Sequence, residues 1–154
     1  MDVYVRLKEL KLELPSPPKK GGIYTQAREF GDNMCYLSGF GTDINGVQNY
    51  NGKLGKEYTI EQGQQAAANC ILNILAVLHQ KLGDLNRIKR FVKMLAFVAS
   101  DDNFFNQPSV ANGASQLLVD LFGEEIGLPA RSAIGVNVLP GNIPVEIELL
   151  LEVD

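Results

Sequence analysis

The sequence predicts an α+β domain in which two helices pack on one face of a mixed sheet. The predicted elements follow the order strand, strand, helix, strand, helix, strand, strand, and just two of them are long helices. Two helices are too few to cover both faces of a sheet, so the rules of layer packing place them together on one side. The other face keeps apolar residues that need a cover, and self-association is the simplest one.

The first third of the chain predicts a hairpin after an irregular start. The apolar residues of 3–14 fit a short helix followed by a strand, and their period does not decide. PSPPKKGGIY, with three prolines and two glycines, predicts an extended crossing segment. A turn at 31–33 then leads into a strand at 34–38. We expect the Gly- and Asn-rich loop that follows to return as a short strand at 53–55.

The remaining elements are two helices and three strands. Thr59, with Gln62 three residues later, forms the capping-box pattern that begins a helix, and Gly83 is suited to end it. We expect a strand at 90–98 and a second helix at 109–122, stopped by Gly123. The last two strands, 130–138 and 145–153, are joined by LPGNIP, which we expect to fold them together. The apolar stripe of the first helix comprises Ala67, Cys70, Ile71, Ile74, Leu75, Leu78 and Leu82.

Length and composition narrow the functional classes. The 154 residues fit a single domain, 1–154, with 1–14 as an N-terminal extension. The net charge of −4 and the pI near 5.0 argue against a nucleic-acid partner. Without a signal-peptide pattern or an apolar run of bilayer length, we expect a cytoplasmic protein with no membrane partner. Cys35 and Cys70 lack paired spacing and His79 is a single histidine, so we expect no metal.

A series of motifs resembles one known family. PxPPKxxGxY at 15–24, CYLSG at 35–39, LGDLNRIKR at 82–90 and PARSAIGVNVLPGNIPVEIE at 129–148 occur in this order. Together they resemble the RidA/YjgF family of reactive-intermediate (imine/enamine) deaminases, also labelled endoribonuclease L-PSP. The resemblance implies a chorismate-mutase-like α+β fold of the bacillary type, assembled as a homotrimer with clefts between neighbouring subunits. It also implies hydrolysis of 2-imino or enamine acids to 2-keto acids and ammonia, without cofactor or metal.

The resemblance also assigns roles to individual residues. Arg131 matches the arginine that holds the substrate carboxylate, a task suited to a planar and permanently charged fork. Glu146 matches the glutamate that positions or activates a water near the imine carbon, which is general acid/base chemistry. The other matches, which bind substrate in the cleft, are Tyr24, Ser38, Gly39 and Asn112.

The same residues also have ordinary structural explanations. An arginine at a strand start is commonly a surface or ion-paired residue, and Glu146 alternates with apolar positions as on the solvent side of an edge strand. Ala133 stands where many family members have cysteine, which bears on substrate range more than on the reaction. Two other functions stay open. One is a non-catalytic trimer that binds small carboxylates for regulation or buffering; the other is the ribonuclease or translation inhibitor of the older label, against which the acidic pI weighs.

Overall fold

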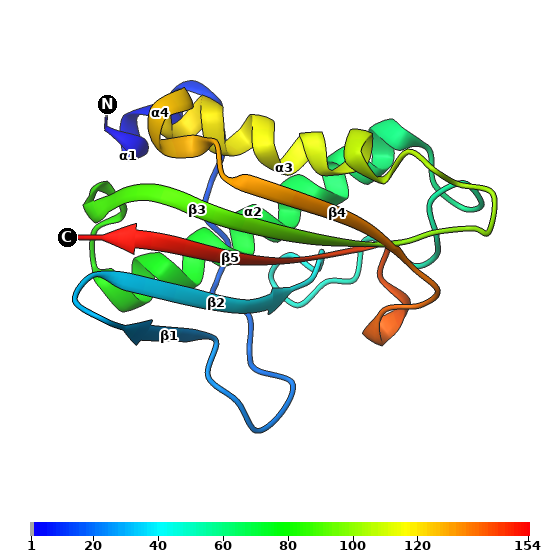
Figure 1. Ribbon diagram of the computed structural model, residues 1–154, viewed down its shortest axis with the longest axis horizontal. Helices are drawn as coiled ribbons and strands as arrows, with labels where there is room; N and C mark the ends of the chain where they lie inside the picture. The colour runs from blue at the N-terminus through cyan, green and yellow to red at the C-terminus, as the bar shows by residue number, and fades with distance from the viewer. Residues whose placement is uncertain (1) are drawn as a thin grey trace.

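A computed structural model describes residues 2–154 as one five-stranded mixed sheet with helices on one side (Figure 1). The strand order is β1-β2-β5-β3-β4, and every neighbouring pair is antiparallel except β3 and β4, which are parallel. The predicted α+β class with a mixed sheet is confirmed. The strands are β1 (Ala27–Phe30), β2 (Met34–Phe40), β3 (Ile88–Ala99), β4 (Ala130–Val136) and β5 (Val145–Val153).

Two long helices cover a single face of this sheet. They are α2 (Ile60–Leu82) and α3 (Gln107–Phe122), which pack against each other; in the view of Figure 1, α2 crosses behind the strands and α3 runs beside β4 at the top. Short helices precede and follow them: α1 (Val3–Glu9) near the N-terminus and α4 (Glu124–Gly127) after α3. The opposite face of the sheet carries no helix in the described part of the chain. Within residues 2–154, no helix combines the length and the apolar character that a bilayer span requires.

Local sequence signals explain where the long helices begin and end. The Thr59 hydroxyl accepts a hydrogen bond from the Gln62 N–H at 3.3 Å, and the Gln62 side chain accepts one from the Thr59 N–H at 2.9 Å. This is the predicted capping box, and Gly83, at φ 78°, ends α2 as predicted. The whole predicted apolar stripe of α2 is buried. Helix α3 begins earlier than expected because Pro108 is favourable in a first helical turn, where its missing N–H would have no partner.

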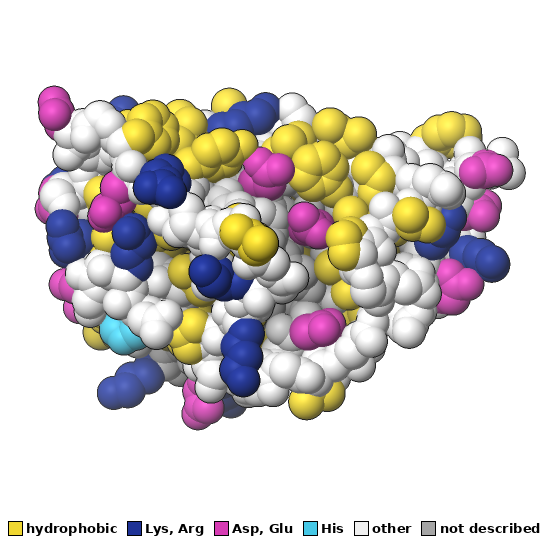
Figure 2. Space-filling view, turned by 90° about the horizontal axis from the view of Figure 1, so that it is seen from below, with side chains coloured by type: hydrophobic (Ala, Val, Ile, Leu, Met, Phe, Trp, Pro, Cys, Tyr) yellow, Lys and Arg dark blue, Asp and Glu magenta, His cyan; other side chains and the backbone are white. Residues whose placement is uncertain are grey.

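Strand β5 shows how the two faces of the sheet differ. Every second residue of β5 is buried against the helices, with at most 7% of its surface exposed, and the residues between them are half-buried on the helix-free face. Several apolar side chains stay on that face, and Figure 2, in which it lies along the top, shows hydrophobic groups gathered there among charged ones. They include the exposed Tyr36 and Ile134 and the partly buried Leu95, Phe97 and Leu150.

Two expectations about the strands are wrong. β4 and β5 do not pair, because β3 lies between them and bonds to both, so the LPGNIP connection crosses the end of β3. Residues 53–55 form no strand; Leu54 makes isolated bridges with Tyr58 and Ser100 instead. For residues 3–14 the apolar period did not decide the structure. They contain helix α1 at Val3–Glu9, and no strand follows it within 10–14. Pairing partners depend on distant segments, and a local period does not reveal them.

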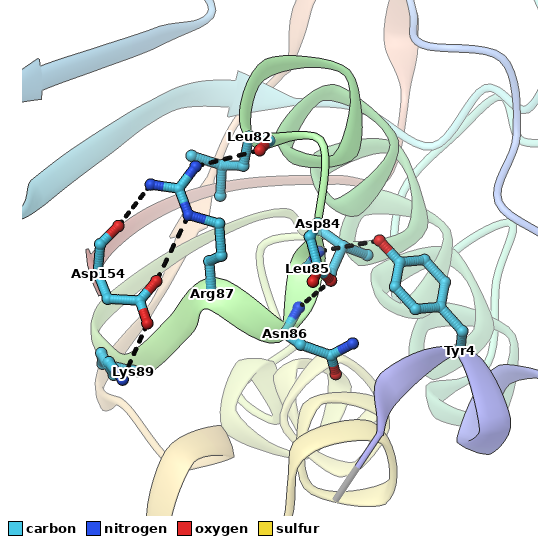
Figure 3. Close-up of polar contacts among 8 residues, drawn as sticks. All are labelled: Tyr4, Leu82, Asp84, Leu85, Asn86, Arg87, Lys89 and Asp154. Atoms are coloured by element: carbon cyan, nitrogen blue, oxygen red, sulfur yellow. Dashed lines mark hydrogen bonds and ion pairs between the residues drawn. The ribbon is translucent and has the colours of Figure 1, made fainter.

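Polar contacts tie both ends of the described chain to the connection between α2 and β3 (Figure 3). The Tyr4 hydroxyl accepts a hydrogen bond from the Leu85 N–H at 2.9 Å. At the other end, Arg87 Nη2 donates to the backbone oxygen of Asp154 at 2.5 Å, and Lys89 Nζ lies 3.0 Å from the Asp154 carboxylate. These cations, Lys89 first, lower the pKa of the Asp154 carboxyl group.

Candidate active site

Arg131 lies on β4 and points toward α3. Its Nη1 donates hydrogen bonds to Asn112 Oδ1 at 2.9 Å and Ser115 Oγ at 3.0 Å, and its Nη2 donates to the carbonyl of Pro108 at 3.2 Å. Asn112 and Ser115 are three residues apart, so they share one face of α3. The structure therefore brings the predicted pair Arg131 and Asn112 into direct contact.

These three bonds leave part of the guanidinium free. Arginine carries five N–H donors, and two of them, one on Nε and one on Nη2, have no partner among residues 2–154. Donors on neighbouring nitrogens can hold a carboxylate through two hydrogen bonds. The α3 contacts thus fix the orientation of Arg131 without using up its capacity to bind an anion.

Glu146 lies on β5 against the backbone of Gly39. A Cβ placed on Gly39 would be 2.0 Å from Glu146 Oε1, far closer than two atoms can approach without bonding. Any larger residue at this position would therefore displace the carboxylate. The room comes from a bulge, because the register between β2 and β5 shifts between Leu37 and Phe40, where Ser38 and Gly39 lie.

The surroundings of Glu146 favour its protonated form. Partial burial of the carboxyl group is the main cause that raises its pKa, and the negative charge of Glu148 raises it further. Glu148 is two residues away on the same face of β5, and it accepts a hydrogen bond from the Tyr36 hydroxyl at 2.5 Å. A carboxyl group with a raised pKa exchanges protons closer to neutral pH, as a general acid or base must.

Tyr24, Ser38 and Gly39 line two pockets around the β2 bulge. Tyr24 precedes β1, is 43% exposed, and lines a pocket of about 230 Å³ together with Gly39. Ser38 and Gly39 also line a second pocket, of about 290 Å³, on the helix-free face. The Ser38 Oγ is buried and has no hydrogen-bond partner within the described residues. With Glu146 against Gly39, four of the predicted site residues gather at this bulge.

The two groups of predicted site residues lie on opposite faces of the sheet. Arg131 pairs with Met94, which is fully buried under the helices, whereas Glu146 pairs with Phe97 on the other face. Cross-strand partners point to the same side, and residues three apart in a strand point to opposite sides. The LPGNIP connection therefore does not bring Arg131 and Glu146 of a single chain together.

Sequence reasoning missed three neighbours of the predicted residues. Ser115 follows Asn112 by three positions on α3, and Glu148 follows Glu146 by two positions on β5. Both spacings place the residues on a shared face, which is the signal that could have identified them. No local spacing could have identified Tyr36, because its contact with Glu148 depends on the pairing of β2 with β5.

Within residues 2–154, no group of three His, Cys, Asp or Glu side chains is arranged to hold a metal ion.

Comparison with known proteins identifies the family. A family model described as "YjgF/chorismate_mutase-like, putative endoribonuclease" matches residues 5–153. The chain therefore belongs to the YjgF family, and both the RidA/YjgF resemblance and the predicted chorismate-mutase-like fold are confirmed.

Individual relatives span a range of similarity. The chain is 46% identical to Protein TCP17 of Trypanosoma cruzi over 103 residues, which cover 67% of this chain and 64% of TCP17. It is 27% identical over 144 residues to a 2-iminobutanoate/2-iminopropanoate deaminase of Dermatophagoides farinae, covering 93% of this chain and 95% of that protein. The crystal structure of Atu1372, a protein of unknown function from Agrobacterium tumefaciens, is 38% identical. It superposes with a TM-score of 0.90, covering 99% of this chain and 92% of that one.

Proposed function

We propose that the chain forms a homotrimer that hydrolyses 2-imino or enamine acids to 2-keto acids and ammonia. The observation that carries this proposal is the separation of Arg131 from Glu146 on opposite faces of one sheet. Both residues match the family pattern, yet they can act on one small molecule only if Arg131 of one protomer faces Glu146 of its neighbour. Each cleft would then lie between two copies of the chain.

The helix-free face supports assembly. Apolar side chains on it, such as the exposed Ile134 and the partly buried Leu95 and Phe97, have no helix over them in the described part of the chain. An apolar sheet face of this kind is typical of an interface between subunits. The family relationship, together with the similarity to the deaminase of Dermatophagoides farinae, supports the imine deaminase reaction.

In this proposal Arg131 binds and orients the substrate. Its two free N–H donors hold the substrate carboxylate, while Asn112 and Ser115 keep the guanidinium in place. Fixing the carboxylate places the adjacent imine carbon at a defined position, which removes much of the entropic cost of reaction with water.

Glu146 then transfers protons. Its carboxylate accepts a proton from a water as the water oxygen bonds to the carbon of the protonated imine, which forms a neutral carbinolamine. The same carboxyl group returns this proton to the nitrogen. The C–N bond then breaks as the hydroxyl oxygen forms the C=O bond, and the departing ammonia takes up the hydroxyl proton, so the products are the 2-keto acid and ammonium. The raised pKa of Glu146 suits a group that must both accept and donate a proton.

The test uses imines generated in situ by an amino-acid oxidase, with the rate of imine loss as the readout. We expect Arg131→Ala to abolish the acceleration of imine loss. Arg131→Lys should retain little of this acceleration, because lysine lacks the planar fork of arginine. An Arg131→Ala variant that works at the wild-type rate would exclude the proposed role of this residue. Arg6→Ala, which removes an arginine on α1, outside the candidate site and on the helix-covered side, is the control.

Glu146→Gln separates catalysis from binding alone. A deaminase should lose turnover in this variant and still bind a 2-keto acid, which calorimetry measures. If neither the wild type nor the variant turns over any imine but both bind the 2-keto acid, the chain is a non-catalytic carboxylate-binding trimer.

A further inference from the structure

The second pocket at the β2 bulge contains an arginine that the proposed reaction does not use. This pocket of about 290 Å³ opens on the helix-free face and is lined by Thr25, Arg28, Tyr36, Leu37, Ser38, Gly39 and Glu148. It shares Gly39 with the site of Glu146, because the Glu146 carboxylate lies against this glycine. A ligand that reacts at Glu146 therefore has this pocket directly beside it.

Arg28 differs from the other arginines of the chain. Arg6, Arg87, Arg90 and Arg131 each donate a side-chain hydrogen bond or form an ion pair. The Arg28 side chain has no such partner in the part of the chain that the structure describes. Its full set of donors is therefore free to bind a carboxylate bidentately.

The positive and negative side chains of this pocket lie on different strands of the sheet. Arg28 lies on β1 and pairs with Tyr36 on β2, so both side chains point to the same face. Glu148, on β5, accepts its hydrogen bond from Tyr36, and it does not form an ion pair with Arg28. The pocket is thus positive on its β1 side and negative on its β5 side, where Glu146 also lies. This arrangement favours a ligand with its anionic end at Arg28 and its nitrogen-bearing end near the two glutamates.

The separation of Arg28 from Glu146 sets the length of such a ligand. β1 and β5 are about 10 Å apart with β2 between them, and Arg28 and Glu146 are offset by about 13 Å along the strands. Both side chains are long and shorten this gap. A substrate with a short apolar side chain would end before Arg28, whereas a side chain that carries its own carboxylate extends toward it.

We propose that Arg28 binds a second carboxylate at the side-chain end of the substrate, so that the enzyme prefers imines of dicarboxylic amino acids. This inference rests on the proposed deaminase function and adds the class of substrate to it. Arg28 is then a specificity-determining residue, while Arg131 of a neighbouring protomer holds the carboxylate next to the imine carbon.

The test compares kcat/KM for 2-iminoglutarate and 2-iminobutanoate, each generated in situ. We expect the wild type to prefer 2-iminoglutarate by about tenfold or more, and Arg28→Met to lose about tenfold on this substrate alone. Arg28→Lys should keep part of the preference because it keeps the charge. Arg6→Met is the matched control, since it removes an arginine on α1, outside the pocket and on the helix-covered side, and should change neither rate. Equal wild-type rates on both imines, or equal losses on both in Arg28→Met, would overturn the proposal.

A binding measurement separates failure of this inference from failure of the proposed function. If no imine is turned over, calorimetry with 2-oxoglutarate and 2-oxobutyrate still tests Arg28. We expect Arg28→Met to weaken the binding of 2-oxoglutarate about tenfold and to leave 2-oxobutyrate unchanged. Unchanged binding of both keto acids would refute the role of Arg28, whatever the outcome of the activity assays.

Discussion

The two faces of β5 differ in what covers them. One face is buried against the helices of its own chain. The other is half-buried and carries two neighbouring glutamates, and no helix of residues 2–154 lies over it. Alternate residues of this one strand therefore belong to two different surfaces. One set builds the core, and the other lies on the face that a second chain would cover in the proposed trimer. The first set is Val145, Ile147, Leu149, Leu151 and Val153; the second is Glu146, Glu148, Leu150 and Glu152.

Arg131 and Glu146 show the same contrast at the candidate site. α3 holds Arg131 through three hydrogen bonds on the helix-covered side, so the guanidinium is oriented before any ligand arrives. Glu146 faces the uncovered side, where its carboxylate makes no hydrogen bond to another described residue. Under the proposed function, carboxylate binding is preorganised within one chain, whereas proton transfer would depend on how a neighbouring chain closes the cleft.

The largest expected effect on stability comes from the buried face of β5. Leu149→Ala removes a fully buried side chain and should lower the free energy of unfolding by about 2–5 kcal/mol. Leu150→Ala changes the next residue, on the helix-free face. At low protein concentration it should lower the free energy of unfolding less than Leu149→Ala does, and it should weaken self-association. Urea denaturation at several protein concentrations measures both effects. Equal, concentration-independent losses in the two variants would contradict the division of β5 between two surfaces.

The second effect concerns the glycine that makes room for Glu146. Gly39→Ala introduces a Cβ at 2.0 Å from the present position of Glu146 Oε1, so the carboxylate must move. A displacement of about 1 Å can reduce the rate about 100-fold, and we expect a loss of this size in kcat/KM. Gly21→Ala adds a methyl group to open space and serves as the control. Full activity in Gly39→Ala would show that the position of Glu146 against this glycine is not important.

The smallest effect is a pH dependence of stability. The pKa of Glu146 is raised in the folded chain above its ordinary value of 4.5, so the fold binds this proton more tightly than the unfolded chain does. The resulting stabilisation is present at low pH and is lost as the pH rises through the raised pKa. Glu146→Gln should therefore be more stable than the wild type at pH 7, and the difference should disappear below about pH 4. Urea midpoints at both pH values test this, with the exposed Glu13→Gln as the control; a variant that is less stable at pH 7 would contradict it.

Local signals in the sequence predicted much of the fold. The Thr59 capping box, the apolar stripe of α2 and the alternation along β5 each depend on residues a few positions apart, and all three were correct. The pairing of β3 with both β4 and β5 was not predicted, because it depends on contacts between segments about 40 to 60 residues apart. For the same reason, the sequence did not reveal that Arg131 and Glu146 lie on opposite faces.

Some features of the candidate site could have been predicted from the sequence. The hairpin turn at 31–33 sets the register of β1 against β2, so the pairing of Arg28 with Tyr36 could have been counted from the turn. What could not be counted is that Arg28 has no side-chain partner within residues 2–154 while the other arginines do. That property depends on the positions of acceptors throughout the fold, and it is the feature that distinguishes Arg28 from an ordinary surface arginine.

The central claim is that one cleft combines Arg131 of one protomer with Glu146 of another. Complementation tests it directly: Arg131→Ala and Glu146→Gln chains, each expected to be inactive alone, are unfolded, mixed in equal amounts and refolded together. With random assembly, about a quarter of the clefts would contain an intact Arg131 and an intact Glu146 from different chains, so about a quarter of the wild-type activity should return. Refolded mixtures that form trimers and remain as inactive as the separate variants would contradict the account.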